Sequence, residues 1–134
     1  MKKLELNRDD LTRPHKAYRK WLLMQAQMQQ DYADSEKAIS LLKLVEAVYG
    51  ADLTTGLMLC RAWSDSGMLE PLEEKVNILL AQHELSGEQR AAIYYCLSVA
   101  RWNAGDRIGA RKAHRLYASL MTSNLQEAHE KSTD

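Results

Sequence analysis

The stretch that decides the fold lies at residues 94–120 and reads YYCLSVARWNAGDRIGARKAHRLYASL. Apolar residues recur at spacings of three and four on both sides of Gly105, which is the pattern of two amphipathic helices. Gly105 allows a tight reversal of the chain. The small residues Ser98 and Ala110 allow the two helices to cross closely. The stretch therefore predicts a helix, a short turn and a second helix packed against the first.

The same arrangement recurs upstream, with turns expected at Ala33 and Gly67. A helix-turn-helix period of about 34 residues is the signature of tetratricopeptide (TPR) repeats. The step from Ala33 to Gly67 equals this period, whereas the step from Gly67 to Gly105 is longer by about four positions. We expect the extra residues near 82–87, either in the helix that ends there or in the loop that follows it. We therefore predict an all-α fold of three tandem TPR-like helix-turn-helix repeats, about six helices in all, that form a short right-handed superhelix. A helical bundle with accidental spacing is the alternative.

Helix start and stop signals fall between the apolar stripes. Gly50, Gly67 and Gly105 follow stripes as C-terminal stops, and Pro71 suits the first turn of a helix. Ser86 with Gln89 forms a capping box. We expect a flexible N-terminal arm at 1–11, a repeat domain at 12–122 that begins with Thr12 and Pro14, and a flexible C-terminal tail at 123–134, because both ends are polar and lack periodicity.

Composition narrows the function. The chain has 134 residues with 18 Lys and Arg against 18 Asp and Glu, so its net charge is zero, whereas a general nucleic-acid binder carries a basic excess. No apolar run is long enough to predict insertion into a membrane. Cys60 and Cys96 lie inside helical patterns, where we interpret them as reduced core thiols of a cytoplasmic protein. The histidines His15, His83, His114 and His129 are scattered without metal-ligand spacing. We predict no enzyme activity, no metal and no cofactor.

In TPR geometry the first helix of each repeat lines a concave groove that grips a partner helix or an extended peptide. The expected groove residues are Leu23, Gln27, Gln30, Leu57, Arg61, Ser64, Tyr95, Val99 and Trp102. Tyr95 and Trp102 would be binding anchors, unless they pack against a terminal segment of the same chain. Arg107, Arg111 and Arg115 form a basic stripe, which is either a face for an acidic partner or a solvated helix surface.

Several segments resemble the YscY family, small TPR-like chaperones of bacterial type III secretion systems. Residues 95–100, 105–106, 110–114 and 117–120 resemble the C-terminal repeat of that family, and residues 21–23 and 38–42 are similar to its opening helix pair. The likeness spans residues 18–122. It implies a cytosolic bacterial chaperone that forms a heterodimer with a YscX-type secreted partner and docks with it on the cytosolic domain of a YscV-type export gate.

Other roles stay open from the sequence. Related chaperones bind translocators (the SycD class) or needle subunits (the YscG class). The chain is short for the first class, and Leu69-Glu70-Pro71-Leu72 only approaches the Leu-Glu-Pro-Trp stretch of the second. A structural TPR scaffold that homodimerises is an alternative function. An all-α regulator that binds nucleic acid through the arginine stripe is a weaker one.

Overall fold

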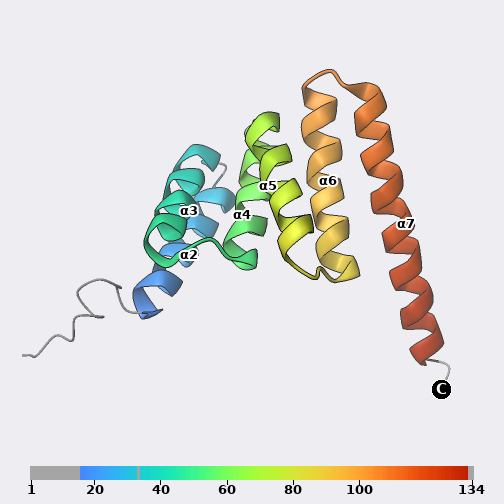
Figure 1. Ribbon diagram of the computed structural model, residues 1–134, viewed down its shortest axis with the longest axis horizontal. Helices are drawn as coiled ribbons and strands as arrows, with labels where there is room; N and C mark the ends of the chain where they lie inside the picture. Colours follow the sequence, from blue (N-terminus) through green and yellow to red (C-terminus); the bar gives the residue numbers. More distant parts are fainter. Residues whose placement is uncertain (1–15, 33, 133–134) are drawn as a thin grey trace, which may run out of the picture.

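The computed structural model describes residues 16–32 and 34–132, the last six of them by their backbone only. Within these residues there are six helices and no strand, which confirms the all-α prediction: α2 (Lys16–Asp31), α3 (Ser35–Tyr49), α4 (Leu53–Asp65), α5 (Leu69–Gln82), α6 (Gly87–Asn103) and α7 (Arg107–Ser132) (Figure 1). The arm expected at 1–11 and the helix start expected at Thr12 and Pro14 lie outside the described residues.

Three of the inter-helix turns share one hydrogen bond. In each, a backbone N–H donates to the carbonyl oxygen five residues earlier: Asp34 to Gln29 (2.8 Å), Met68 to Trp63 (2.8 Å) and Asp106 to Arg101 (2.9 Å). Gly67 and Gly105 precede two of these donors with φ 73 and φ 87, a positive-φ conformation that favours glycine. The three donors, Asp34, Met68 and Asp106, each lie one residue after a turn position that the sequence predicts, so the spacing between them is the predicted one.

Side-chain caps begin four of the helices, and at α7 the Asp106 carboxylate accepts from the Gly109 N–H at 2.9 Å. The predicted capping box is present: the Ser86 hydroxyl accepts from the Gln89 N–H at 3.1 Å, and the Gln89 side chain accepts from the Ser86 N–H at 2.9 Å. Asp34 and Asp52 cap α3 and α4 by accepting from Lys37 N–H and Thr55 N–H. These aspartates satisfy backbone donors that have no partner inside the helix.

The extra residues between the turns at Gly67 and Gly105 lie in a different helix from the one that the sequence predicts. Helix α6 has 17 residues where its counterpart α4 has 13. Helix α5 is not lengthened, and its loop at 83–86 exceeds the loop at 50–52 by a single residue. The reason is the capping box, which starts α6 at Gly87 and is followed by good helix formers.

Helix α7 runs for 26 residues to Ser132, ten residues beyond the end predicted for the repeat domain at residue 122. Residues 123–132 contain neither Gly nor Pro, so nothing in the sequence ends the helix there. The expectation relied on the loss of apolar periodicity, which reports the loss of a buried face and does not end a helix.

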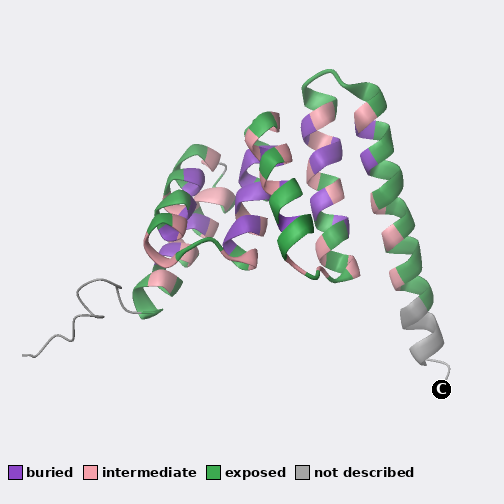
Figure 2. Cartoon of the chain, viewed as in Figure 1, coloured by how far each residue is buried: buried purple, intermediate pink, exposed green. Residues whose placement is uncertain are grey.

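One hydrophobic core runs through all six helices (Figure 2). Helix α4 lies at its centre, in contact with α3, α5 and α6. Leu59 on α4 and Leu72 on α5 are fully buried. Gly56 lets α5 approach α4, because a Cβ there would stand 2.9 Å from Leu79 Cδ2.

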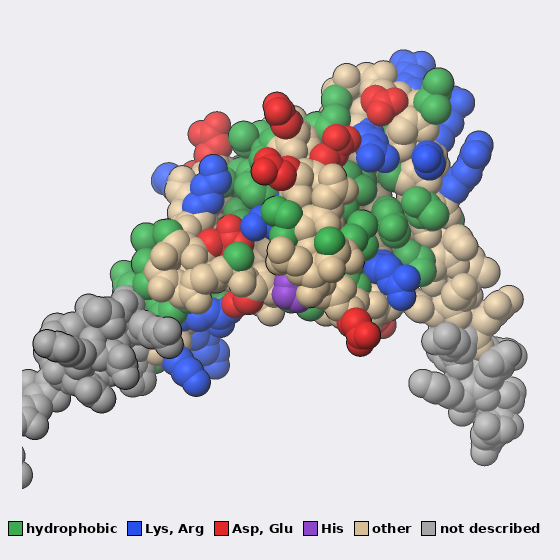
Figure 3. All heavy atoms as spheres, in the orientation of Figure 1, with side chains coloured by type: hydrophobic (Ala, Val, Ile, Leu, Met, Phe, Trp, Pro, Cys, Tyr) green, Lys and Arg blue, Asp and Glu red, His purple; other side chains and the backbone are tan. Residues whose placement is uncertain are grey.

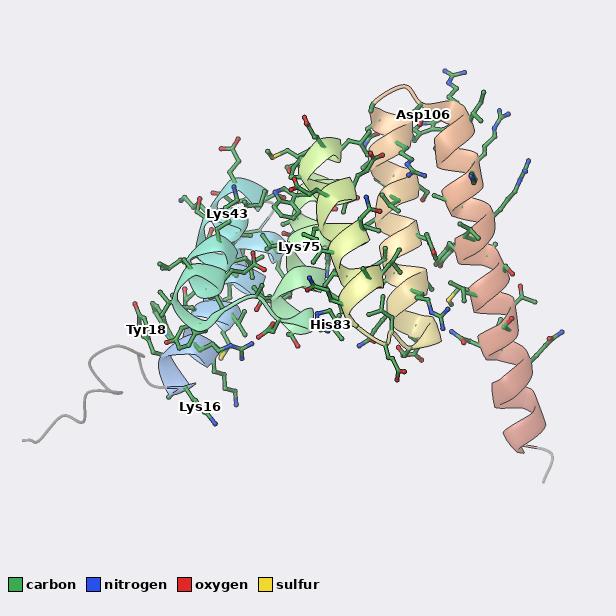
Figure 4. All side chains as sticks on the ribbon, viewed as in Figure 1. Lys16, Tyr18, Lys43, Lys75, His83 and Asp106 are labelled. Atoms are coloured by element: carbon green, nitrogen blue, oxygen red, sulfur yellow. The ribbon has the colours of Figure 1, made fainter. Side chains whose placement is uncertain are left out.

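Ion pairs join successive hairpins near the core. Lys75 on α5 pairs with Glu46 on α3 at 2.8 Å, and both side chains are largely buried (Figure 4). Arg101 on α6 pairs with Glu73 on α5 at 3.2 Å and donates to the Gly109 carbonyl at 3.3 Å. The hairpins α2–α3, α4–α5 and α6–α7 therefore form one body. None of the helices described is both long and apolar enough to cross a membrane.

Candidate partner-binding groove

Eight of the nine groove residues expected from the sequence line a row of three hollows on α2, α4, α6 and α7. Gln27, Gln30, Leu57 and Arg61 line the first; Leu57, Arg61, Ser64, Tyr95 and Val99 line the second; and Tyr95, Val99 and Trp102 line the third. Neighbouring hollows share residues, so these side chains belong to adjoining parts of one surface. Leu23 lines none of these three hollows and packs, partly buried, against the core.

The polar residues of the first two hollows are engaged within the protein. Ser64 is buried, and its hydroxyl donates to the Cys96 carbonyl oxygen at 3.0 Å, which ties α4 to α6. Gln30 donates through Nε2 to the Asp65 carboxylate, and Arg61 lies 4.0 Å from the same carboxylate. Ser64 is therefore a structural link between α4 and α6, whereas the buried Oε1 of Gln30 in the first hollow has no hydrogen-bond partner among the described residues.

The third hollow presents the aromatic residues. Tyr95 and Trp102 on α6 are each 52% exposed. The Tyr95 ring stands 5.4 Å from the Tyr117 ring of α7, which fixes its position at the wall of the pocket. The pocket measures about 490 Å³. A volume of this size has room for several side chains of a partner.

The basic stripe borders this same pocket. The sequence did not predict that the arginines and the aromatic residues lie side by side. Arg111 and Arg115 line the pocket together with Tyr95 and Trp102. The Arg107 guanidinium lies 5.3 Å from the Trp102 ring centroid, which is the distance of a cation–π contact. Figure 3 shows Lys and Arg side chains gathered over the N-terminal end of α7. The stripe and the aromatic end of the groove are one site.

A second pocket between α6 and α7 continues from Tyr95 toward the C-terminus of the chain. Its walls include Ala92 on α6 and Tyr117, Met121 and Leu125 on α7. The sequence analysis did not place these residues in the groove, and Leu125 lies beyond residue 122, where the predicted repeat domain ended. The four-residue spacing of Tyr117, Met121 and Leu125 is the signal that could have found them.

The two cysteines carry no sign of a nucleophile. Burial raises the pKa of the Cys60 thiol to about 12 and that of the Cys96 thiol to about 11. At pH 8 only about one Cys96 in a thousand would be a thiolate, the reactive form. Among the described residues, no group of three His, Cys, Asp or Glu side chains is placed to hold a metal ion.

Native protein at pH 8 should therefore react with iodoacetamide far more slowly than protein unfolded in urea, because unfolding returns both thiols to their ordinary pKa near 9. Both raised pKa values also predict that the thiols' contribution to the free energy of unfolding is constant below about pH 9. It falls as the pH rises toward about 11 or 12, since only the unfolded chain then ionises. Mass spectrometry of the alkylated protein checks the first expectation. Rapid labelling of either cysteine in the native state would contradict it.

The fold and the site define a class: an all-α protein of three helical hairpins with an uncovered aromatic and basic groove between its last two helices. Comparisons with protein-family models, with curated proteins and with solved structures find no match to the chain.

Proposed function

We propose that this chain is a TPR-like cytoplasmic chaperone of a bacterial type III secretion system. It binds and stabilises a small helical secreted partner of the YscX type as a heterodimer and helps to dock it on a YscV-type export gate. The observation that carries the proposal is the row of hollows on α2, α4, α6 and α7, which ends at the exposed rings of Tyr95 and Trp102.

The TPR-like part of the proposal is supported by the equivalence of the turns. The bonds Asp34 to Gln29, Met68 to Trp63 and Asp106 to Arg101 recur at the repeat spacing. Helix α4 contacts both its hairpin partner α5 and the first helix of the next hairpin, α6. Repeat proteins bury their cores in this way, through contacts between neighbouring units, and their stacking produces a superhelix with a concave face.

The partner-holding part is supported by the uncovered aromatic residues. Tyr95 and Trp102 are half exposed at the edge of an apolar pocket. Tyr and Trp side chains in such positions dominate the binding energy of protein interfaces. A helix laid into such a groove buries its apolar face against them. An aggregation-prone helix of a secreted protein would be shielded in this way before export.

Co-expression tests the proposal. The chain is produced with a YscX-type protein from the same genome, and with a needle subunit and a translocator as competing clients. A stable one-to-one complex with the YscX-type protein, absent with the other two, is the expected result. A complex with the needle subunit or translocator would reassign the client, and no complex with any of the three would overturn the chaperone function.

A homodimeric scaffold is the second candidate, favoured by an exposed stripe on α2. The stripe consists of Tyr18, Trp21, Met24 and Met28 on α2 and of Tyr32 directly after its end, all of them exposed. Such a face on the end helix of a stack could join two copies. Light scattering on the isolated chain separates the functions, because a scaffold stays dimeric whether or not a client is present.

A further inference from the structure

The two pockets between α6 and α7 adjoin at Tyr95, whose ring contacts that of Tyr117, and together they are here called the α6–α7 groove. On α6 it runs from Trp102 to Glu88, a rise of about 21 Å at about 1.5 Å per residue. That length fits about four turns of a helix. Its apolar lining comprises Ala91, Ala92, Tyr95, Val99, Trp102, Ala110, Tyr117, Met121 and Leu125.

The cations of the groove lie at one end of it, and Glu88 lines the other end. Arg111 and Arg115 lie one turn apart at one end of the groove, and Arg107 lies one turn nearer to the N-terminus of α7. Other cations next to the core have carboxylate partners, as Lys75 has Glu46 and Arg101 has Glu73. In the described part of the chain, no carboxylate forms an ion pair with Arg107, Arg111 or Arg115. An occupant that covered the apolar lining would partly desolvate Arg111 and Arg115, which is costly unless the occupant supplies the missing carboxylates.

A second copy of the chain does not supply them. One exposed apolar face that it could offer is the stripe on α2, and the same helix carries the exposed cations Lys16, which Figure 4 labels, and Lys20. Docking that face in the α6–α7 groove would bring cations toward cations. Like charges placed against each other across an interface oppose binding.

We infer that the α6–α7 groove takes an amphipathic helix of a different protein, in which carboxylates one turn apart flank the apolar stripe at one end. The apolar stripe packs on Tyr95, Val99 and Tyr117, and the carboxylates pair with Arg111 and Arg115. The inference rests on the proposed function and narrows its partner to an acidic helix with a defined orientation, its acidic end at the N-terminus of α7.

Two synthetic helical peptides test this. Both peptides have the same apolar stripe and a length of about five turns, which is enough to span the groove. They differ at two positions that flank the stripe one turn apart, where one peptide carries Glu and the other carries Lys. Titration calorimetry on the full chain should show the Glu peptide binding at least about tenfold more tightly than the Lys peptide at about 50 mM salt, with the ratio shrinking at about 500 mM because salt screens the pairs. The double variant Arg111→Glu, Arg115→Glu should reverse the preference.

The matched control is Arg90→Glu with Lys112→Glu, which makes the same change in net charge at exposed positions outside the groove. It should keep the preference for the Glu peptide. Equal binding of the two peptides, or equal effects of the two double variants, would overturn the inference. If Trp102→Ala in that case weakens the binding of both peptides equally, the groove still binds helices but does not select acidic ones. Failure of both peptides to bind also overturns the inference, whereas the proposed function fails only if the co-expression complex is absent too.

Discussion

Replacing both Tyr95 and Trp102 with Ala should weaken binding of the YscX-type partner by at least about a hundredfold. Anchor residues of this kind contribute about 2 kcal/mol or more each, and a loss of about 2.8 kcal/mol corresponds to about a hundredfold in the dissociation constant. Because both rings are half exposed in the free protein, their removal should leave the helical content unchanged and should lower the free energy of unfolding less than truncation of fully buried rings would. Calorimetric titration and circular dichroism measure the two effects.

Trp21→Ala is the matched control for this variant. Trp21 is 50% exposed, close to the 52% of Trp102, but it lies on α2 at the opposite end of the stack (Figure 1). It should leave partner affinity unchanged. If Trp21→Ala abolishes binding while the double variant does not, the partner site is the stripe on α2. If the double variant loses helicity, Tyr95 and Trp102 belong to the core and the groove is misassigned.

Leu59→Ala should lower the free energy of unfolding by about 3 kcal/mol, because a buried leucine that is truncated leaves a cavity. Leu59 is fully buried on α4, which contacts three other helices, so this cavity cannot collapse without shifting its neighbours. Urea unfolding followed by circular dichroism should show a lower midpoint with an unchanged slope.

Leu44→Ala makes the same chemical change on the surface of α3, where the side chain is 45% exposed. It should cost less than about 1 kcal/mol, since little apolar area returns to water. Equal losses for the two variants would mean that the core does not run continuously through α4. A change of slope with Leu59→Ala would mean that the hairpins unfold separately.

The turns of the fold could be predicted because their chemistry is local. Gly67 and Gly105 occupy positive φ, and Ser86 with Gln89 forms its capping box. Each depends on residues within a few positions of one another. The spacing between the turns then determined which faces of α2, α4 and α6 are equivalent.

What the sequence did not predict depends on tertiary context. Ser64 was expected to face a partner and instead bonds to the Cys96 carbonyl, because α4 and α6 approach closely there. The single site made by the arginine stripe and the aromatic residues depends on how α7 packs along α6. Helix periodicity places Arg111 on a face of its own helix, but it does not say that this face adjoins Trp102.

Partner binding at the groove is tested most directly by the indole N–H signals of the protein's three Trp residues in a nitrogen–proton NMR spectrum. Trp102 lies in the α6–α7 groove, Trp21 on the outer face of α2, and Trp63 in the core, where it is 5% exposed. On titration with the YscX-type protein, the Trp102 signal should shift and lose its exchange with water, while the Trp21 signal stays in place. A shift of Trp21 with Trp102 unchanged would contradict the account.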